Sequence, residues 1–91
     1  MICKRVIYSG RVQGVGFRYT AQRVAGGFPI VGYVKNLPSG SVELVAQGEA
    51  GQVEAFLQTL AGQMAGYIRN TAITDEAPGN YEGFGLSLIH I

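Results

Sequence analysis

The sequence predicts an α+β domain in which an antiparallel sheet of four or five strands carries two helices on one face. Two stretches repeat their apolar residues with helical spacing, and the stretches around them are rich in β-branched and aromatic residues, which favour strands. The predicted order is strand, helix, strand, strand, helix, strand, with a further strand at the end. The chain has 91 residues, of which 47% are hydrophobic and 14% charged, so we expect one apolar core and a single domain over residues 1–91.

A strand, a glycine-rich loop and a helix are predicted in the first part of the chain. Residues 2–9, ICKRVIYS, mix β-branched, aromatic and basic residues, which suits a strand covered in part on both faces. After the loop, apolar residues recur at three- and four-residue spacing, and Gly26, Gly27 and Pro29 end this pattern. The pattern predicts a short amphipathic helix with the apolar positions Phe17, Ala21, Val24 and Ala25.

A hairpin, a second helix and two strands are predicted in the rest of the chain. Residues 30–36 and 41–47 predict two antiparallel strands, because the LPSG between them is typical of a tight reverse turn. From Glu49 the helical spacing returns, in the apolar stripe Val53, Phe56, Leu57, Leu60 and Met64. Residues 67–74 and 84–91 predict the last two strands. This order predicts the split β-α-β, or ferredoxin-like, sandwich, which hosts enzymes and binding modules alike and therefore decides no function.

Composition excludes several classes of protein. Seven Lys and Arg against six Asp and Glu lack the basic excess of a nucleic-acid-binding surface. The single cysteine, Cys3, can form neither an internal disulfide nor a thiolate metal site, which favours a reducing compartment. No apolar run is long enough for a membrane span. The apolar stretch between Arg5 and Ser9 is too brief for a signal-peptide core. We therefore expect a cytoplasmic monomer with no nucleic-acid partner, membrane partner, metal or cofactor.

The stretch GRVQGVGFR, residues 10–18, points to an anion site. A loop that enters a helix N-terminus presents N–H groups that have no partner inside the helix, and the helix dipole adds partial positive charge there. Gly14 and Gly16 allow left-handed or otherwise unusual backbone dihedrals, which let the N–H groups of residues 13–18 turn toward one point. The planar guanidinium of Arg18 can donate hydrogen bonds to two phosphate oxygens at once. Phosphate is the anion that fits best, whereas the stretch matches neither common nucleotide-binding motif.

Together with GYVKN at 32–36 and GSVEL at 40–44, the glycine-rich stretch resembles the acylphosphatase family over essentially the whole chain. The resemblance implies metal-independent hydrolysis of acyl phosphates to a carboxylate and inorganic phosphate. It implies that Arg18 binds the phosphate and that Asn36 holds the attacking water. The substrate-binding residues that it implies are Gln13, Gly14, Val15, Gly16, Phe17 and Arg18. Similar sequence also opens some larger hydrogenase-maturation and carbamoyl-transfer proteins.

The residue chemistry agrees with this implied reaction. A carboxamide can both donate to and accept from a water, which would direct the water's lone pair toward phosphorus. The leaving carboxylate belongs to an acid with a pKa of roughly 4, so it departs without protonation. The transition state is loose, and positioning with electrostatic stabilisation can account for most of the catalysis.

Two other functions share the predicted fold. A non-catalytic regulatory domain is the main alternative, because N–H groups and an arginine bind phosphate or a small anion whether or not a water is aligned. An RNA-recognition domain would use aromatic side chains on its third strand, and residues 41–47 have none. His90 is expected to be a polar residue at the end of a strand. The acidic residues are expected to be solvated surface charges: Glu43, Glu49, Glu54, Asp75, Glu76 and Glu82.

Overall fold

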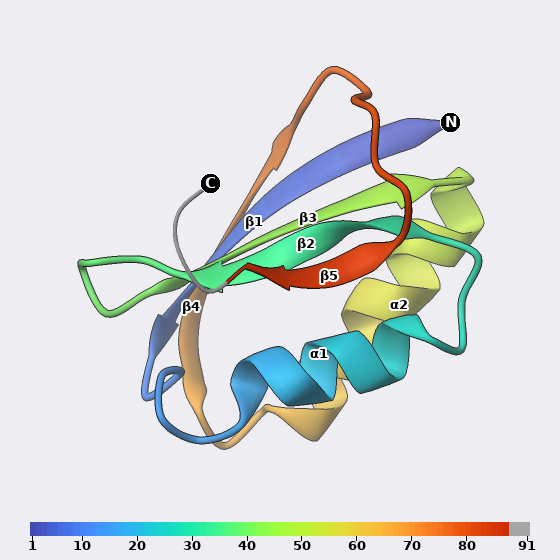
Figure 1. Ribbon diagram of the computed structural model, residues 1–91. Coiled ribbons are helices and arrows are strands. Elements are labelled where there is room, and N and C mark those ends of the chain that lie inside the picture. The colour runs from blue at the N-terminus through green and yellow to red at the C-terminus, as the bar shows by residue number, and fades with distance from the viewer. Residues whose placement is uncertain (88–91) are drawn as a thin grey trace.

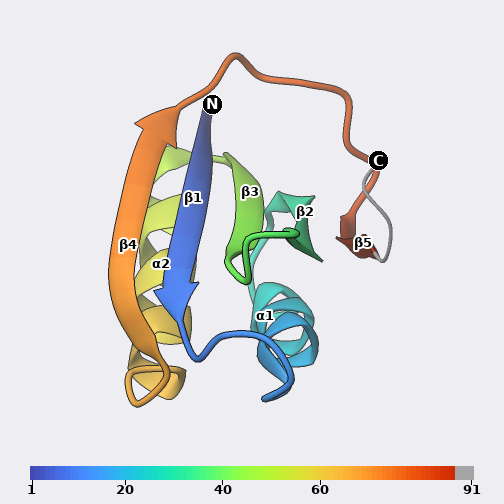
Figure 2. The ribbon, with the colours of Figure 1, turned by 90° about the vertical axis from the view of Figure 1, so that its left-hand side faces the viewer.

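The computed structural model describes residues 1–87, and within them seven elements follow one another along the chain (Figure 1). They are β1 (Ile2–Gly10), α1 (Phe17–Ala25), β2 (Val31–Asn36), β3 (Val42–Gly48), α2 (Ala50–Gln63), β4 (Ile68–Asp75) and β5 (Phe84–Ser87). Both helices cover one face of a sheet with the strand order β4-β1-β3-β2-β5 (Figures 1 and 2). The predicted ferredoxin-like sandwich is confirmed. The predicted end of the last strand, 88–91, lies outside the described residues.

The prediction of a wholly antiparallel sheet is wrong at one edge. β1 pairs antiparallel with β3 and β4, and β2 pairs antiparallel with β3, but β5 runs parallel to β2. The direction of β5 follows from the loop 76–83, which leaves the end of β4 and crosses to the opposite edge at the same end of the sheet (Figure 2). A chain that turns back in this way runs antiparallel to β4, and this is the direction of β2.

The apolar core lies between the sheet and the two helices. Alternate residues of the strands point into it, as the two-residue period of a strand requires. The predicted apolar faces of both helices are confirmed, with Leu57 half-buried at the margin of the core. The fully buried side chains with the largest volumes are Tyr8, Phe17, Phe56, Leu44, Leu60, Val6, Val12, Val34, Val42 and Val53.

The sheet face away from the helices is covered in part by the loop 76–83. Gln47 Nε2 donates to the carbonyl oxygen of Gly79 at 3.0 Å, and the Gly79 N–H donates to Gln47 Oε1 at 2.7 Å. The rings of Tyr33 and Tyr81 lie 6.1 Å apart. This loop therefore buries polar groups of the central strands that would otherwise face solvent.

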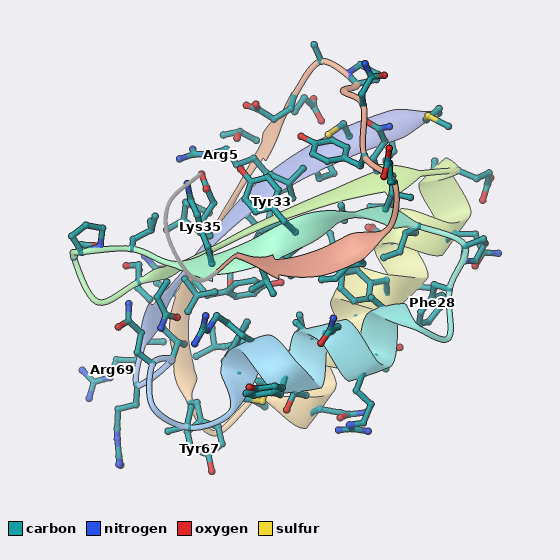
Figure 3. The ribbon with its side chains drawn as sticks, viewed as in Figure 1. Arg5, Phe28, Tyr33, Lys35, Tyr67 and Arg69 are labelled. Carbon is teal, nitrogen blue, oxygen red and sulfur yellow. The ribbon has the colours of Figure 1, made fainter. Side chains whose placement is uncertain are left out.

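Glu43 corrects the expectation that all acidic residues are solvated. Its side chain is 7% exposed and accepts hydrogen bonds from Arg5 Nε at 2.5 Å and from the Tyr33 hydroxyl at 3.2 Å. Lys35 Nζ lies 3.4 Å from Glu43 Oε1, the oxygen that also accepts from Tyr33, whereas Arg5 contacts Oε2. The three partners share one sheet face (Figure 3). Burial alone would raise the pKa of Glu43, but the hydrogen bond and charge of Arg5 hold it below its usual value.

Candidate active site

The glycine-rich loop joins the end of β1 to the start of α1. Gly14 and Gly16 have φ of 77° and 81°, the left-handed region that disfavours residues with a side chain. Apart from the two adjacent residues, no heavy atom of residues 1–87 lies within 4 Å of the position that a Cβ would take at either glycine, so the requirement for glycine is conformational rather than steric. The predicted unusual backbone dihedrals are confirmed at both positions, and both are left-handed.

Both ends of this loop are fixed by packing. Val12 is 1% exposed, and Phe17 is buried against Tyr8 with 4.9 Å between the ring centroids. The N–H of Arg11 donates to the carbonyl oxygen of Tyr67 at 2.9 Å, which ties the end of β1 to the segment before β4. The glycine-rich loop therefore changes direction between two ends that are held in place by packing and hydrogen bonding.

The N-terminus of α1 opens onto the loop. Gly16 is its N-cap residue, and no side-chain hydrogen bond of the described residues caps the helix there. The N–H groups of the first turn of a helix have no partner inside the helix, and they carry the positive end of its dipole. The local backbone therefore suits a bound anion.

A pocket of about 180 Å³ lies where the loop, the first turn of α1 and the end of β2 meet. Its lining residues are Val12, Gly14, Gly16, Phe17, Arg18, Tyr19 and Asn36. None of these seven described residues is acidic, and Arg18 supplies the positive charge. Sites for drug-sized ligands measure about 300–1,000 Å³, so this pocket suits a small anion.

Arg18 and Asn36 reach the pocket from different elements. Arg18 is half-buried in the first turn of α1, directly after the buried Phe17. Asn36 is the last residue of β2, and because side chains alternate along a strand it faces the same side as the core residue Val34. That side carries the helices. The structure thus brings together the two residues for which the family resemblance implies binding of the phosphate and of the attacking water.

Two of the predicted substrate-binding residues do not line the pocket. The Gln13 side chain points to the β2–β3 hairpin, and Val15 packs in part against the core. The prediction for both concerns their backbone N–H groups and stays a prediction. Sequence reasoning missed Tyr19, which is 68% exposed and lines the pocket; its position directly after Arg18 was the only available signal.

Known proteins are similar to this chain over nearly its whole length. The family model described as Acylphosphatase matches residues 4–86. The chain belongs to the acylphosphatase family. An acylphosphatase of Petrotoga mobilis is 45% identical over 86 residues, which cover 92% of this chain and 96% of that protein. The family that the glycine-rich stretch and the hairpin resemble is therefore confirmed.

Solved structures agree with this assignment to the acylphosphatase family. The crystal structure of acylphosphatase from Bacillus subtilis superposes with a TM-score of 0.86 at 29% identity and covers 96% of this chain and 99% of that chain. The structure of T. kodakarensis HypF gives a TM-score of 0.84 at 30% identity, covering 100% of this chain but 12% of that chain. An acylphosphatase-like domain therefore also occurs inside a much longer protein.

The described part of this acylphosphatase-family chain shows neither a cluster of metal ligands nor a membrane-spanning helix. Among the described residues, no group of three or more His, Cys, Asp or Glu side chains could hold a metal ion. Nor does the described part of the chain contain a helix of the length and apolar character needed to cross a membrane. His90 lies outside the described residues.

Proposed function

We propose that this pocket hydrolyses the carboxyl–phosphate bond of acyl phosphates, giving a carboxylate and inorganic phosphate. The observation that carries the proposal is that Arg18 and Asn36 line one small pocket at the N-terminus of α1. Membership of the acylphosphatase family supports it. No metal or cofactor takes part in the proposed reaction.

Arg18 and the loop backbone bind the phosphate. The guanidinium is a planar fork that donates two parallel hydrogen bonds to phosphate oxygens. The N–H groups of residues 13–18 add further donors, because Gly14 and Gly16 turn the backbone in the left-handed direction. These donors neutralise the charge that the transferring phosphoryl group carries in the transition state.

Asn36 holds the attacking water. Its amide can donate to and accept from one water molecule, which fixes the direction of the water's lone pair. The water oxygen bonds to phosphorus while the bond from phosphorus to the acyl oxygen breaks, and the carboxylate leaves with the bonding electrons. One proton stays on the attacking oxygen and the other passes to a phosphate oxygen. The carboxylate is a weak base, so no general acid is required.

The direct test is turnover of an acyl phosphate by the purified protein. We expect benzoyl phosphate to break down faster with the protein than in buffer alone, with the same rate in the presence of a chelator. Inorganic phosphate should inhibit competitively, because it occupies the same donors. Binding of phosphate without any turnover would overturn the proposal and favour the non-catalytic anion-binding domain.

The cellular setting is also a proposal. A cytoplasmic location is supported by Cys3, a buried free thiol of the kind that persists in reducing compartments. The monomeric state stays a prediction, and so does the absence of a nucleic-acid partner, which the composition favours.

A further inference from the structure

The side chain of Gln13 joins the glycine-rich loop to the β2–β3 hairpin. Its Nε2 donates to the carbonyl oxygen of Leu37 at 2.8 Å and to that of Ser41 at 2.8 Å. A primary amide nitrogen carries two N–H bonds, so one atom can serve both carbonyls. The loop is thus attached to both ends of the hairpin turn.

These two carbonyls also accept hydrogen bonds from the hairpin itself. The Leu37 N–H donates to the Ser41 oxygen at 2.9 Å, and the Gly40 N–H donates to the Leu37 oxygen at 3.1 Å. A carbonyl oxygen has two lone pairs. The hairpin supplies a donor to each oxygen and Gln13 supplies a second, so the Gln13 side chain stabilises the conformation of the turn.

The turn begins directly after Asn36, at the end of β2. Asn36 therefore belongs to the segment that Gln13 holds, whereas Arg18 belongs to the helix that follows the Gln13 loop. A second and longer contact joins Ser9 Oγ, at the end of β1, to Ser41 Oγ of the hairpin at 3.3 Å. The two hydrogen bonds of Gln13 are shorter and start from the loop itself.

We propose that Gln13 is a positioning residue, whose side chain sets the distance between the water on Asn36 and the phosphate on Arg18. This inference rests on the proposed function. In-line attack needs the water and the phosphorus in contact and aligned, and an error of about 1 Å can reduce the rate about 100-fold. The water and the phosphate are held by different segments, and Gln13 connects these segments.

The test replaces the donor while keeping the length of the side chain. In Gln13→Met the two carbonyls lose their shared donor. We expect kcat for benzoyl phosphate to fall about 10- to 100-fold. The KM and the inhibition constant of inorganic phosphate should change less than about threefold, because the backbone N–H groups and Arg18 remain. Gln13→Asn keeps the amide but is one carbon shorter, and it should give the same kinetic result. It replaces Gln13→Met if that variant does not fold.

Gln22→Met is the matched control, since Gln22 is exposed on α1 and does not line the pocket. It should leave kcat and KM unchanged. An unchanged kcat in both Gln13 variants would overturn the inference. So would a loss of phosphate inhibition in parallel with kcat, which would make Gln13 a phosphate-binding or general structural residue.

A second measurement separates this inference from the proposed function. Absence of turnover in the wild-type protein would contradict the proposed function but not the coupling itself. In NMR spectra, phosphate should shift the side-chain amide signals of Asn36 in the wild-type protein and in Gln22→Met. If the Gln13 variants bind phosphate and show the same Asn36 shift, the coupling through Gln13 is refuted.

Discussion

Arg18, in the first turn of α1, and Asn36, the last residue of β2, line the same pocket. The two side chains come from consecutive elements of the first β-α-β unit, and the glycine-rich loop lies beside them. Arg18 carries a cation, which suits an anionic phosphate, and Asn36 carries a neutral amide, which suits a water molecule. Substitution of each residue alone therefore separates binding of the phosphate from orientation of the water.

Arg18→Ala should abolish both turnover of benzoyl phosphate and inhibition by inorganic phosphate. In the proposed reaction the guanidinium binds the phosphoryl group in the transition state as well as in the ground state, and removal of one such donor costs about 100- to 1,000-fold in kcat. Steady-state kinetics with and without phosphate measure both effects. Arg23→Ala is the control, because Arg23 lies on α1 outside the pocket and donates to Gln63 at 3.0 Å. An Arg18→Ala protein with normal phosphate inhibition contradicts the assignment.

Asn36→Ala should lower kcat about 10- to 100-fold while the inhibition constant of phosphate stays close to the wild-type value. By the proposed mechanism, this variant loses the group that orients the water but keeps the phosphate donors. The same kinetic assay measures it, with Asn70→Ala on the exposed strand β4 as the control. If phosphate inhibition is lost as well, Asn36 contacts the phosphate rather than the water.

Gly16→Ala should lower the free energy of unfolding by about 1–2 kcal/mol and weaken inhibition by phosphate. Its φ of 81° is strained for a residue with a Cβ, although the space around that atom is open. Urea unfolding at neutral pH and phosphate inhibition measure the two effects.

The control for Gly16 is Gly62→Ala, an exposed position in α2 that is also open around the Cβ. There the same change should raise the free energy of unfolding by about 0.5 kcal/mol, because alanine is the better helix former. Equal effects at both positions would show that the left-handed backbone at Gly16 is not required.

Glu43→Gln should lower the free energy of unfolding by about 1–3 kcal/mol at pH 7, because Arg5 loses its charged acceptor. The pKa of Glu43 is lowered in the folded protein, so its stabilising effect is complete above the ordinary value near 4.5 and is lost as the pH falls through the folded value. Urea unfolding at several pH values should therefore show the difference between wild type and variant shrinking below about pH 4.5. A constant difference down to pH 2 contradicts this account.

The helices and strands could be predicted because each carries its own local signal. The stripe from Val53 to Leu60 and the Gly26-Gly27 pair define both helices without information from elsewhere in the chain. The direction of β5 and the burial of Glu43 could not be predicted, because both depend on contacts between strands and on a loop that crosses the sheet. Local periodicity does not report which edge a distant strand joins.

Part of the candidate site could be predicted from local sequence, and part could not. An anion site in the loop follows from Gly14, Gly16 and Arg18 by local physical chemistry. The role of Asn36 came from the family resemblance, since a lone asparagine before a turn is ordinary. The Gln13 hydrogen bonds to Leu37 and Ser41 were not visible in the sequence, because they join positions 24 and 28 residues apart.

The loop 76–83 and the pocket lie at opposite ends of β2. Phe84, the first residue of β5, pairs with Gly32 near the start of β2, and Asn36 is the last residue of β2. Four residues of strand span about 13 Å. A fluorescent label attached at the exposed position 80, without an insertion into the loop, would therefore report on the protein without obstructing access of small molecules to Arg18.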